Sequence, residues 1–243
     1  MHMPEYVVSL TTIPSKFPNL HLTMDSLLQQ TLKPSKIVVN LPKQYNFRLT
    51  GEIPAEQIAA FLQKYPCVVN FVDQDYGPGT KLLGLLKSDL LTGMDPATTY
   101  IILVDDDLIY KPCMIEEFDQ TVKQNNQVAS FWVYPFGDLQ VGQGADGFLM
   151  QLKLLDHFLN YYDRIKDQDY VNYHDDFYIS YYFQLFKQPI KHAAAPPGGI
   201  YAMHPNTFTD ALCKLQDKYS RPNVNHHTYS ILTDLHRRGA FVF

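Results

Sequence analysis

The stretch YIILVDDDLIY, residues 100–110, places three consecutive aspartates directly after five residues that have the composition of a buried strand. Neighbouring carboxylates repel one another, and burial raises the free energy needed to ionise each of them. A positive group therefore belongs beside Asp105, Asp106 and Asp107. In open α/β sheets, ligands bind at the edge where parallel strands end, so we expect this positive group to belong to a ligand site.

Short apolar runs alternate with helical patterns through the first half of the chain. Four runs rich in Val, Ile and Leu predict strands at residues 6–10, 36–41, 67–72 and 100–104. Stripes of leucine follow the first and third runs, and their spacing of three and four residues predicts helices. Strands that alternate with helices, and that lack polar alternation themselves, are typical of a mostly parallel sheet with helices on both faces. The sequence therefore predicts an α/β fold.

After about residue 128 the pattern becomes more irregular. The run VASFWVY (128–134) predicts another strand, and a Tyr-rich helix is expected to begin at residues 174–176. Between them, the apolar spacing predicts a helical stripe formed by Phe148, Leu152, Leu155, Leu159 and Tyr162. Neither an internal repeat nor a low-complexity linker divides the chain, so residues 1–243 are predicted to form a single domain.

The bulk composition narrows the class of protein. The 243 residues carry a net charge of −5 and have a pI of about 5.9, which does not favour a nucleic-acid-binding surface. Three scattered cysteines, Cys67, Cys113 and Cys213, form neither a disulfide framework nor a zinc-binding pair. No apolar run approaches the roughly 20 residues that span a bilayer, and the N-terminal residues lack the pattern of a secretion signal. We therefore expect a cytoplasmic protein without a transmembrane segment.

The three aspartates suit a hard divalent cation. If the extended conformation of the strand persists, Asp105 and Asp107 share one side and Asp106 points to the other. Such a carboxylate pair can bind Mg²⁺ or Mn²⁺, whose charge offsets the repulsion. The competing explanation is that the acids cap the next helix or lie solvated in a turn. Their position after a buried run favours the metal.

A second acidic cluster opens the segment HDDFYISYYFQLF, residues 174–186. Asp175 and Asp176 stand at the expected start of a helix, where the helix dipole favours negative charge. Simple N-capping explains one of them well. Alternatively, one carboxylate acts as a general base, and the surrounding tyrosines form a surface for a polar, ring-shaped substrate. The residues alone leave both explanations open.

Two loops carry groups that suit phosphate. In DQDYGPGTKLLG (73–84), Gly77, Gly79 and Lys81 stand at a strand-to-helix turn, where backbone N–H groups and a lysine can bind an anion. The loop matches neither a P-loop nor the GxGxxG pattern, so neither an ATPase nor a dinucleotide site is supported. The matching loop after the first strand, SLTTIPSK (9–16), offers hydroxyl groups and Lys16.

Taken in order, these motifs resemble those of a known family. The order is SLTTIP, DYGPGTKLLG, LVDDD, GQGADGFLM and HDDFYISYY. It resembles that of the GT-A nucleotide-diphospho-sugar glycosyltransferases, and it is most similar to small inverting, family-2-like enzymes of bacteria and large DNA viruses. The resemblance covers about residues 6–186 and rests on the order and spacing of the motifs. It implies one Rossmann-like GT-A domain in which about residues 1–125 bind the nucleotide sugar and about residues 126–243 bind the acceptor.

The resemblance also implies roles for individual residues. Asp105 and Asp107 match the family's DxD motif, so Asp107 would bind the Mn²⁺ or Mg²⁺ that bridges the donor diphosphate, and Asp105 would contact the ribose or the metal. Asp176 takes the position of the catalytic base, and Asp175 stands where the family has a glutamate. The further donor-binding residues would be Thr11, Ile13, Pro14, Lys81 and Asp106. The histidine that binds the metal would be His227, with His226, His236 and His204 as alternatives.

The implied activity is metal-dependent, inverting transfer of a sugar from a nucleotide-diphosphate donor, with a UDP-sugar expected, to a glycan or another hydroxyl acceptor. Asp176 would deprotonate the acceptor, while the metal and Lys81 would stabilise the departing diphosphate. Two alternatives stay open. One is a nucleotidyltransferase, although TTIPSKFPNL (11–20) lacks the glycines of its phosphate loop. The other is a non-catalytic module that binds sugar nucleotides or carbohydrates.

Overall fold

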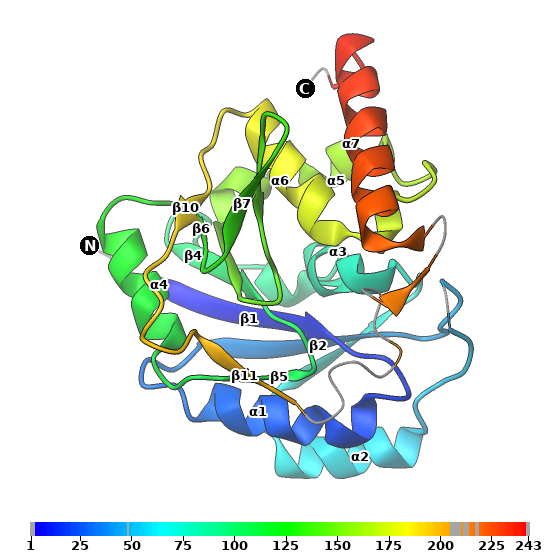
Figure 1. Cartoon of the computed structure of the whole chain (residues 1–243). Coiled ribbons are helices and arrows are strands. Elements are labelled where there is room, and N and C mark those ends of the chain that lie inside the picture. Colours follow the sequence, from blue (N-terminus) through cyan, green and yellow to red (C-terminus); the bar gives the residue numbers. More distant parts are fainter. Residues whose placement is uncertain (1–2, 48, 205–209, 211–213, 217–218, 242–243) are drawn as a thin grey trace.

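The computed structural model describes residues 3–47, 49–204, 210, 214–216 and 219–241, so Cys213 lies outside the described residues. Its centre is a seven-stranded sheet with the strand order β10-β6-β9-β4-β1-β2-β3 (Figure 1). These strands are β1 (Glu5–Thr11), β2 (Lys36–Pro42), β3 (Val68–Val72), β4 (Thr99–Leu103), β6 (Val128–Ser130), β9 (Phe148–Gln151) and β10 (Lys191–His192). Two-stranded sheets pair β5 (Leu108–Tyr110) with β11 (Tyr201–Met203) and β7 (Val133–Phe136) with β8 (Leu139–Gly142).

Parallel pairing dominates the large sheet. β1 is parallel to both β2 and β4, β2 is parallel to β3, and β6 is parallel to β10. Only β9 runs antiparallel, between β4 and β6. The predicted α/β fold with a mostly parallel sheet is therefore confirmed. Because β1, β2 and β4 are parallel neighbours, they all end at the same edge of the sheet.

Helices cover both faces of this sheet. Along β1, Tyr6, Val8 and Leu10 face one core and Val7 faces the other, as the alternation of a strand requires. The face of Tyr6 is covered by α1 (Leu20–Leu28), α2 (Ala55–Lys64) and α4 (Met114–Lys123). The opposite face is covered by α3 (Thr80–Leu86), α5 (Phe158–Asp163) and α6 (Asp175–Leu185), and α7 (Arg221–Arg237) packs on α6 (Figure 1). None of the described helices is long and apolar enough to cross a membrane.

Two predictions for the second half of the chain are wrong. The run 128–134 is not one strand, because β6 ends at Ser130 and β7 begins at Val133 in a different sheet. The stripe that starts at Phe148 is not one helix, because β9 takes its first residues and a 3-10 turn separates β9 from α5. β9 lies inside the sheet with every residue buried, so its side chains are apolar on both faces. Over so few residues, such a run also fits the spacing at the start of an apolar helix face.

Buried polar side chains fix the start of α3 against the sheet. The Ser9 hydroxyl donates a hydrogen bond to the Lys81 carbonyl oxygen (2.5 Å), and the Asn40 amide donates to Ser9 Oγ (2.9 Å). Asn70 on β3 donates in turn to Asn40 Oδ1 (2.8 Å). Buried polar groups need partners, so this ladder specifies how the first turn of α3 meets the strands. The ladder thereby positions Lys81 at the edge where β1 and β4 end.

Candidate active site

A cleft of about 370 Å³ opens at the edge where β1, β2 and β4 end, and both halves of the chain line it. This volume is within the range of about 300–1,000 Å³ that is usual for small-molecule sites. Its charged and polar lining comprises Thr11, Thr12, Lys16, Asp75, Lys81, Asp105, Asp106, Asp107, Gln143, His174, Asp175, Asp176, Asp210 and Arg221. Its aromatic lining comprises Tyr45, Phe47, Tyr173, Tyr201 and Tyr219.

The three consecutive aspartates lie in a turn. β4 ends before them, and the chain turns directly into β5, so the expected extended arrangement is not present. Asp105 contacts Lys81, with Nζ 2.7 Å from Oδ1. Asp107 contacts Lys16, whose Nζ is 2.5 Å from Oδ2 and also lies 3.8 Å from Asp106 Oδ1. The positive groups beside the acids in this structure are therefore two lysines, one from the loop after β1 and one from α3.

Burial works against ionisation in this turn. It raises the pKa of Asp107 to about 7, and the charges on Asp106 and Asp105 act in the same direction while Lys16 opposes them. Burial also raises the pKa of Asp106, against the charge on Lys16. For Lys16 itself, burial would lower the pKa, but the neighbouring carboxylates outweigh burial and raise it. The turn thus carries more negative charge than its lysine partners neutralise.

Lys81 connects the two acidic clusters. Its side chain is only 4% exposed, and Nζ lies 2.7 Å from Asp105 Oδ1 and 3.2 Å from Asp175 Oδ2. Burial alone would lower the pKa of Lys81, but the charges on Asp105, Asp175 and Asp176 raise it well above its usual value. Lys81 is therefore a permanent cation between a turn from the first half of the chain and a helix from the second half.

Asp176 stands at the start of α6 with both carboxylate oxygens engaged. Oδ1 accepts a hydrogen bond from the backbone N–H of Gly144 (2.8 Å), and Oδ2 lies 3.5 Å from His174 Nε2. Burial would raise the pKa of Asp176, but His174, Lys81 and the Gly144 N–H together hold it below its usual value. For its neighbour Asp175, burial prevails over Lys81 and raises the pKa. Asp176 is therefore ionised at neutral pH and can accept a proton.

Aromatic side chains form one wall of the cleft. The rings of Phe47 and Tyr173 have centroids 4.6 Å apart, and Tyr173 stacks on Tyr219 at the same centroid distance. Tyr45 is buried, and its hydroxyl donates a hydrogen bond to the Thr12 carbonyl oxygen (3.0 Å). Flat aromatic surfaces with a few polar groups suit a nucleobase or a sugar ring.

The acids of the turn can contribute to a metal site. Within the described residues, no group of three or more His, Cys, Asp or Glu side chains is placed to hold a metal ion by itself. Mg²⁺, however, is usually held by one or two carboxylates together with substrate phosphates and water. Asp105 and Asp107 supply oxygens of this kind, and the Asp105 side chain is 35% exposed to the cleft. The donor set therefore fits Mg²⁺ or Mn²⁺ that binds together with a phosphate-bearing ligand.

The structure brings most of the residues singled out from the sequence into this one cleft. Those that line it are Thr11, Ile13, Lys81, Asp105, Asp106, Asp107 and Asp176. Pro14 does not line it, because the chain leaves the cleft for two residues before returning with Lys16. The N-terminal loop and the two acidic clusters therefore belong to the same site.

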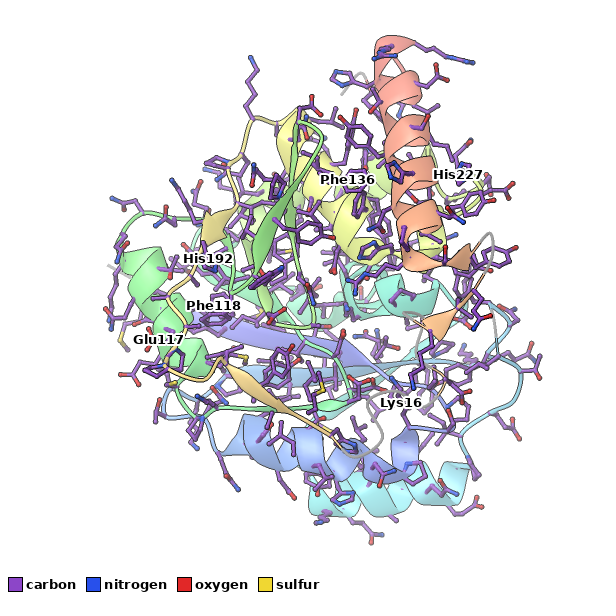
Figure 2. All side chains as sticks on the ribbon, viewed as in Figure 1. Lys16, Glu117, Phe118, Phe136, His192 and His227 are labelled. Atoms are coloured by element: carbon purple, nitrogen blue, oxygen red, sulfur yellow. The ribbon has the colours of Figure 1, made fainter. Side chains whose placement is uncertain are left out.

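The expected metal-binding histidines do not line the cleft. His227 is exposed on α7 and stacks on Tyr170, and Figure 2 shows it away from Lys16. His226 packs against Phe136, and His236 against Tyr181. The structure thus places these three histidines of α7 against aromatic partners and not among the residues that line the cleft.

His204, the remaining alternative, has a buried ring whose Nε2 lies 2.9 Å from the Asn19 carbonyl oxygen. Its backbone N–H donates to the Asp107 carbonyl oxygen (3.3 Å), so it supports the turn through its main chain. The ring itself is not among the residues that line the cleft.

Lys16 and His174 are among the charged or titratable residues of the cleft to which the sequence assigns no role. The sequence shows Lys16 only as a lysine available in its loop, and it places His174 at the start of a helix. The cue for Lys16 is its position in the loop after β1, since every loop at this edge faces the site. No sequence cue distinguishes His174, because only the folded chain brings its ring close to Asp176 and Asn225. Asp176 accepts a hydrogen bond from the Gly144 N–H, and Asn225 is distant along the chain.

Comparisons with known proteins bear on the fold. No protein-family model matches the sequence, and no curated protein matches it. The crystal structure of S. aureus TarS 1–349, a glycosyltransferase, matches with a TM-score of 0.54 at 11% identity, over 98% of this chain and 74% of that one. The same fragment in complex with UDP matches with a TM-score of 0.52 at 12% identity, over 98% and 72%. The chain has their fold.

A nucleotidyltransferase has a similar structure as well. The crystal structure of 4-diphosphocytidyl-2C-methyl-D-erythritol synthase matches with a TM-score of 0.52 at 11% identity, over 85% of this chain and 96% of that one. Together these neighbours confirm the predicted GT-A-like, Rossmann-type fold class. At such identities the likeness establishes the fold and no particular activity.

Proposed function

We propose that this protein is a metal-dependent glycosyltransferase that moves a sugar from a nucleotide-diphosphate donor to an acceptor hydroxyl, with inversion at the anomeric carbon. The observation that carries the proposal is the meeting of the Asp105–Asp107 turn and Asp176 in one cleft, connected through Lys81. The first cluster suits a cation with a diphosphate. The second suits a hydroxyl group that must lose its proton.

The donor is proposed to bind against the residues of the first half of the chain. Thr11 and Ile13 line the part of the cleft next to β1, and the aromatic wall that includes Tyr45 and Phe47 offers surfaces for a nucleobase. Lys16 and Lys81 supply positive charge for phosphate oxygens. TarS has been crystallised with UDP, and this neighbour supports UDP as the first nucleotide to test.

The metal is proposed to bind between the donor and the turn. Asp105 and Asp107 would hold it, and the phosphates and water would complete its coordination. A bound divalent cation would neutralise negative charge on the diphosphate as the bond to the sugar breaks. His227 and the alternative histidines are not part of this proposal, because the structure directs them elsewhere.

Asp176 is proposed to be the catalytic base. Its pKa is held low, so the carboxylate is ionised at neutral pH, and the Gly144 N–H fixes its orientation. It would remove the proton from the acceptor hydroxyl, whose oxygen attacks the anomeric carbon from the side opposite the diphosphate. A displacement in one step inverts that carbon. The acceptor is proposed to enter along the residues after about 126, which include Gln143 and Asp176.

The decisive experiment for the base uses Asp176→Asn, which keeps the shape of the side chain and removes its ability to accept a proton. We expect transfer to fall by about 10²–10⁴-fold, while the affinity for UDP with Mn²⁺, measured by calorimetry, stays close to that of the parent. Asp163→Asn is the control, since Asp163 is an exposed residue that pairs with Lys166. Transfer at the parental rate by Asp176→Asn would refute the assignment.

Metal and nucleotide are tested by thermal stability and by turnover. We expect UDP or GDP to raise the melting temperature far more with Mn²⁺ than with EDTA, because a ligand that binds only the folded state stabilises it. A screen of sugar nucleotides for slow hydrolysis with Mn²⁺ would then identify the donor. Full activity in excess EDTA would rule out the metal role of Asp105 and Asp107. Stabilisation by free glycans alone would indicate a carbohydrate-binding module.

A nucleotidyltransferase is the second candidate, and the match to 4-diphosphocytidyl-2C-methyl-D-erythritol synthase favours it. Such an enzyme would consume a nucleoside triphosphate together with a phosphorylated substrate and release pyrophosphate. The loop after β1 argues against it, because residues 11–20 contain no glycine to bring backbone N–H groups to a triphosphate. Release of pyrophosphate from CTP or UTP with a sugar phosphate would establish this activity, and release of UDP from a UDP-sugar would establish the transferase.

A further inference from the structure

The side chain of His174 lies beside Asp176 with one ring nitrogen unpaired. Nδ1 is 2.5 Å from Asn225 Oδ1 on α7, and Nε2 is 3.5 Å from Asp176 Oδ2. Nε2 is buried and has no hydrogen-bond partner in the described part of the chain. His174 directly precedes α6, but its side chain makes no capping hydrogen bond to the helix. Capping therefore does not account for the position of the ring.

The contact with Asn225 determines which ring nitrogen carries hydrogen. An amide oxygen can only accept, so Nδ1 of His174 carries a hydrogen and donates it to Asn225. Nε2 is then left either with a lone pair or with a second proton. A lone pair would face the ionised Asp176 carboxylate across 3.5 Å. One proton can therefore be shared between Nε2 of His174 and Oδ2 of Asp176.

We propose that His174 is a positioning residue that takes up, through Asp176, the proton released by the acceptor hydroxyl; this inference rests on the proposed glycosyl transfer. The acceptor O–H bond breaks, and its proton passes to Asp176 and from there to Nε2. The acceptor oxygen forms the new bond to the anomeric carbon. The bond from that carbon to the diphosphate oxygen breaks, and its electron pair leaves with the diphosphate. No co-reactant is needed.

The charges around the ring favour this destination for the proton. Among the described residues, the charged and titratable groups that act on this corner are Asp175, Asp176 and Tyr178 of α6, Lys81 of α3, Asp105 after β4, Asp146 in the loop after β8, Tyr134 of β7 and Arg221 of α7. Asp175 pairs with Lys81, so the Asp176 carboxylate is the one that faces the ring.

The intrinsic affinities for a proton point the same way. An imidazole nitrogen is intrinsically a stronger base than a carboxylate oxygen. Of the two groups, the ring is therefore the more favourable place for a proton that reaches this pair. The resulting imidazolium is held between the Asn225 oxygen and the Asp176 carboxylate.

The shared proton can be measured without any turnover. In ¹⁵N-labelled protein, two-bond ¹H–¹⁵N spectra report the tautomer and the pKa of the His174 ring. We expect hydrogen on Nδ1 at high pH, and we expect the pKa of His174 to fall by about 1 or more in Asp176→Asn, because the carboxylate that stabilises the imidazolium is gone. An equal pKa for His174 in both proteins overturns the inference.

The role in the reaction is tested with His174→Gln, which keeps an amide near the position of Nε2 but cannot take up a proton. We expect kcat to fall by about tenfold to hundredfold, with the KM for the donor nearly unchanged. We also expect the acid limb of the kcat profile to move to lower pH, since Asp176 alone then sets it. A parental pH profile in this variant overturns the inference, because a structural role would leave the profile unmoved.

His192→Gln is the matched control. The His192 ring also bonds a protein oxygen, the Phe131 carbonyl (2.7 Å). It is not among the residues that line the cleft, and Figure 2 shows it away from Lys16, so its variant should keep both the rate and the pH profile.

Failure of the proposed function is recognised separately from failure of this inference. If the wild-type protein consumes no sugar nucleotide, glycosyl transfer is refuted, while the titration still decides whether His174 and Asp176 share a proton. If transfer occurs and the titration fails, only the role of His174 is refuted.

Discussion

The cleft contains two acidic clusters whose carboxylates behave in opposite ways. Asp107 and Asp176 are similarly buried, with 8% and 6% of their surface exposed. Burial and two neighbouring carboxylates raise the pKa of Asp107 to about 7, although Lys16 is close. A histidine, Lys81 and a backbone N–H hold the pKa of Asp176 below its usual value despite the same burial.

The comparison of Asp107 with Asp176 shows that burial alone does not determine the pKa of a carboxylate. At Asp176, Oδ1 accepts a hydrogen bond from the Gly144 N–H, Oδ2 lies 3.5 Å from His174 Nε2, and the adjacent Asp175 pairs with Lys81. At the turn, three acids share two lysines, and one of these is also bound to Asp175. The turn therefore has an excess of negative charge that a cationic ligand can neutralise, whereas Asp176 is ionised and can accept a proton.

The largest expected effect is on Lys81, the residue that joins the two clusters. Lys81→Met should lower the free energy of unfolding by about 3–5 kcal/mol, because it leaves the buried Asp175 carboxylate and the partly exposed Asp105 carboxylate without their cation. Urea unfolding measures this change in the free energy of unfolding. Lys87→Met on the exposed end of the same segment is the control. Restoring part of the loss by adding Asp175→Asn would support the shared pairing, and a Lys81→Met protein as stable as the parent would contradict it.

The next effect concerns the support of Asp176. A Cβ added at Gly144 would meet Asp176 Oδ1 at 2.8 Å, so Gly144→Ala must displace the carboxylate. We expect transfer to fall by about a hundredfold, the usual cost of misplacing a reacting group by about 1 Å. Affinity for UDP with Mn²⁺ should change much less, because the added Cβ meets Lys81 Nζ only at 3.3 Å, and the flexible end of the lysine can relieve that contact. Unchanged transfer in this variant would show that the position of Asp176 is not critical.

A smaller effect is expected at the turn. Lys16→Met removes one of two lysines from the first cluster and should weaken UDP binding by about tenfold, the factor that corresponds to roughly 1.4 kcal/mol. Isothermal titration with Mn²⁺ present measures this change. Lys43→Met is the matched control, since Lys43 makes an exposed pair with Asp73, and such pairs contribute little. Equal UDP affinity in both variants would remove Lys16 from the donor site.

The smallest effect is on the pH dependence of stability. Because the folded state holds the pKa of Asp176 below the ordinary 3.8, its ionised form stabilises the fold above that pH. This contribution disappears as the pH falls through the folded pKa. Urea unfolding of the parent and of Asp176→Asn should therefore differ at pH 6 and converge in acid. A difference that grows toward acid would reverse the assigned sign.

The sequence predicted the parts of this molecule that depend on local pattern. Continuous Val and Ile runs identified β1, β2 and β4, because strands buried on both faces leave no polar alternation. A similar run identified β3, although this strand lies at the edge of the sheet and only Val72 in it is buried. The same property misled the prediction at β9, where Phe148 and its neighbours are buried in the middle of the sheet and their spacing also fits a helix. Periodicity cannot separate these two cases over so few residues.

The sequence predicted those members of the candidate site that lie at the edge where the parallel strands end. Asp105, Asp107, Lys81 and Asp176 follow strands or begin helices at that edge, and all four line the cleft. The partners of these residues were not predictable, since they depend on tertiary distances. Asn225, for example, lies 51 positions beyond His174 in the chain, yet it orients the ring.

The bridging position of Lys81 has a consequence for the order of events. Without a donor, one ammonium serves both Asp105 and Asp175. Under the proposed function, a cation and a diphosphate would bind at Asp105 and would free part of that ammonium's charge to serve the acceptor side. We therefore expect ordered kinetics in which the nucleotide sugar binds first and the nucleotide leaves last, so that UDP inhibits competitively against the donor and non-competitively against the acceptor.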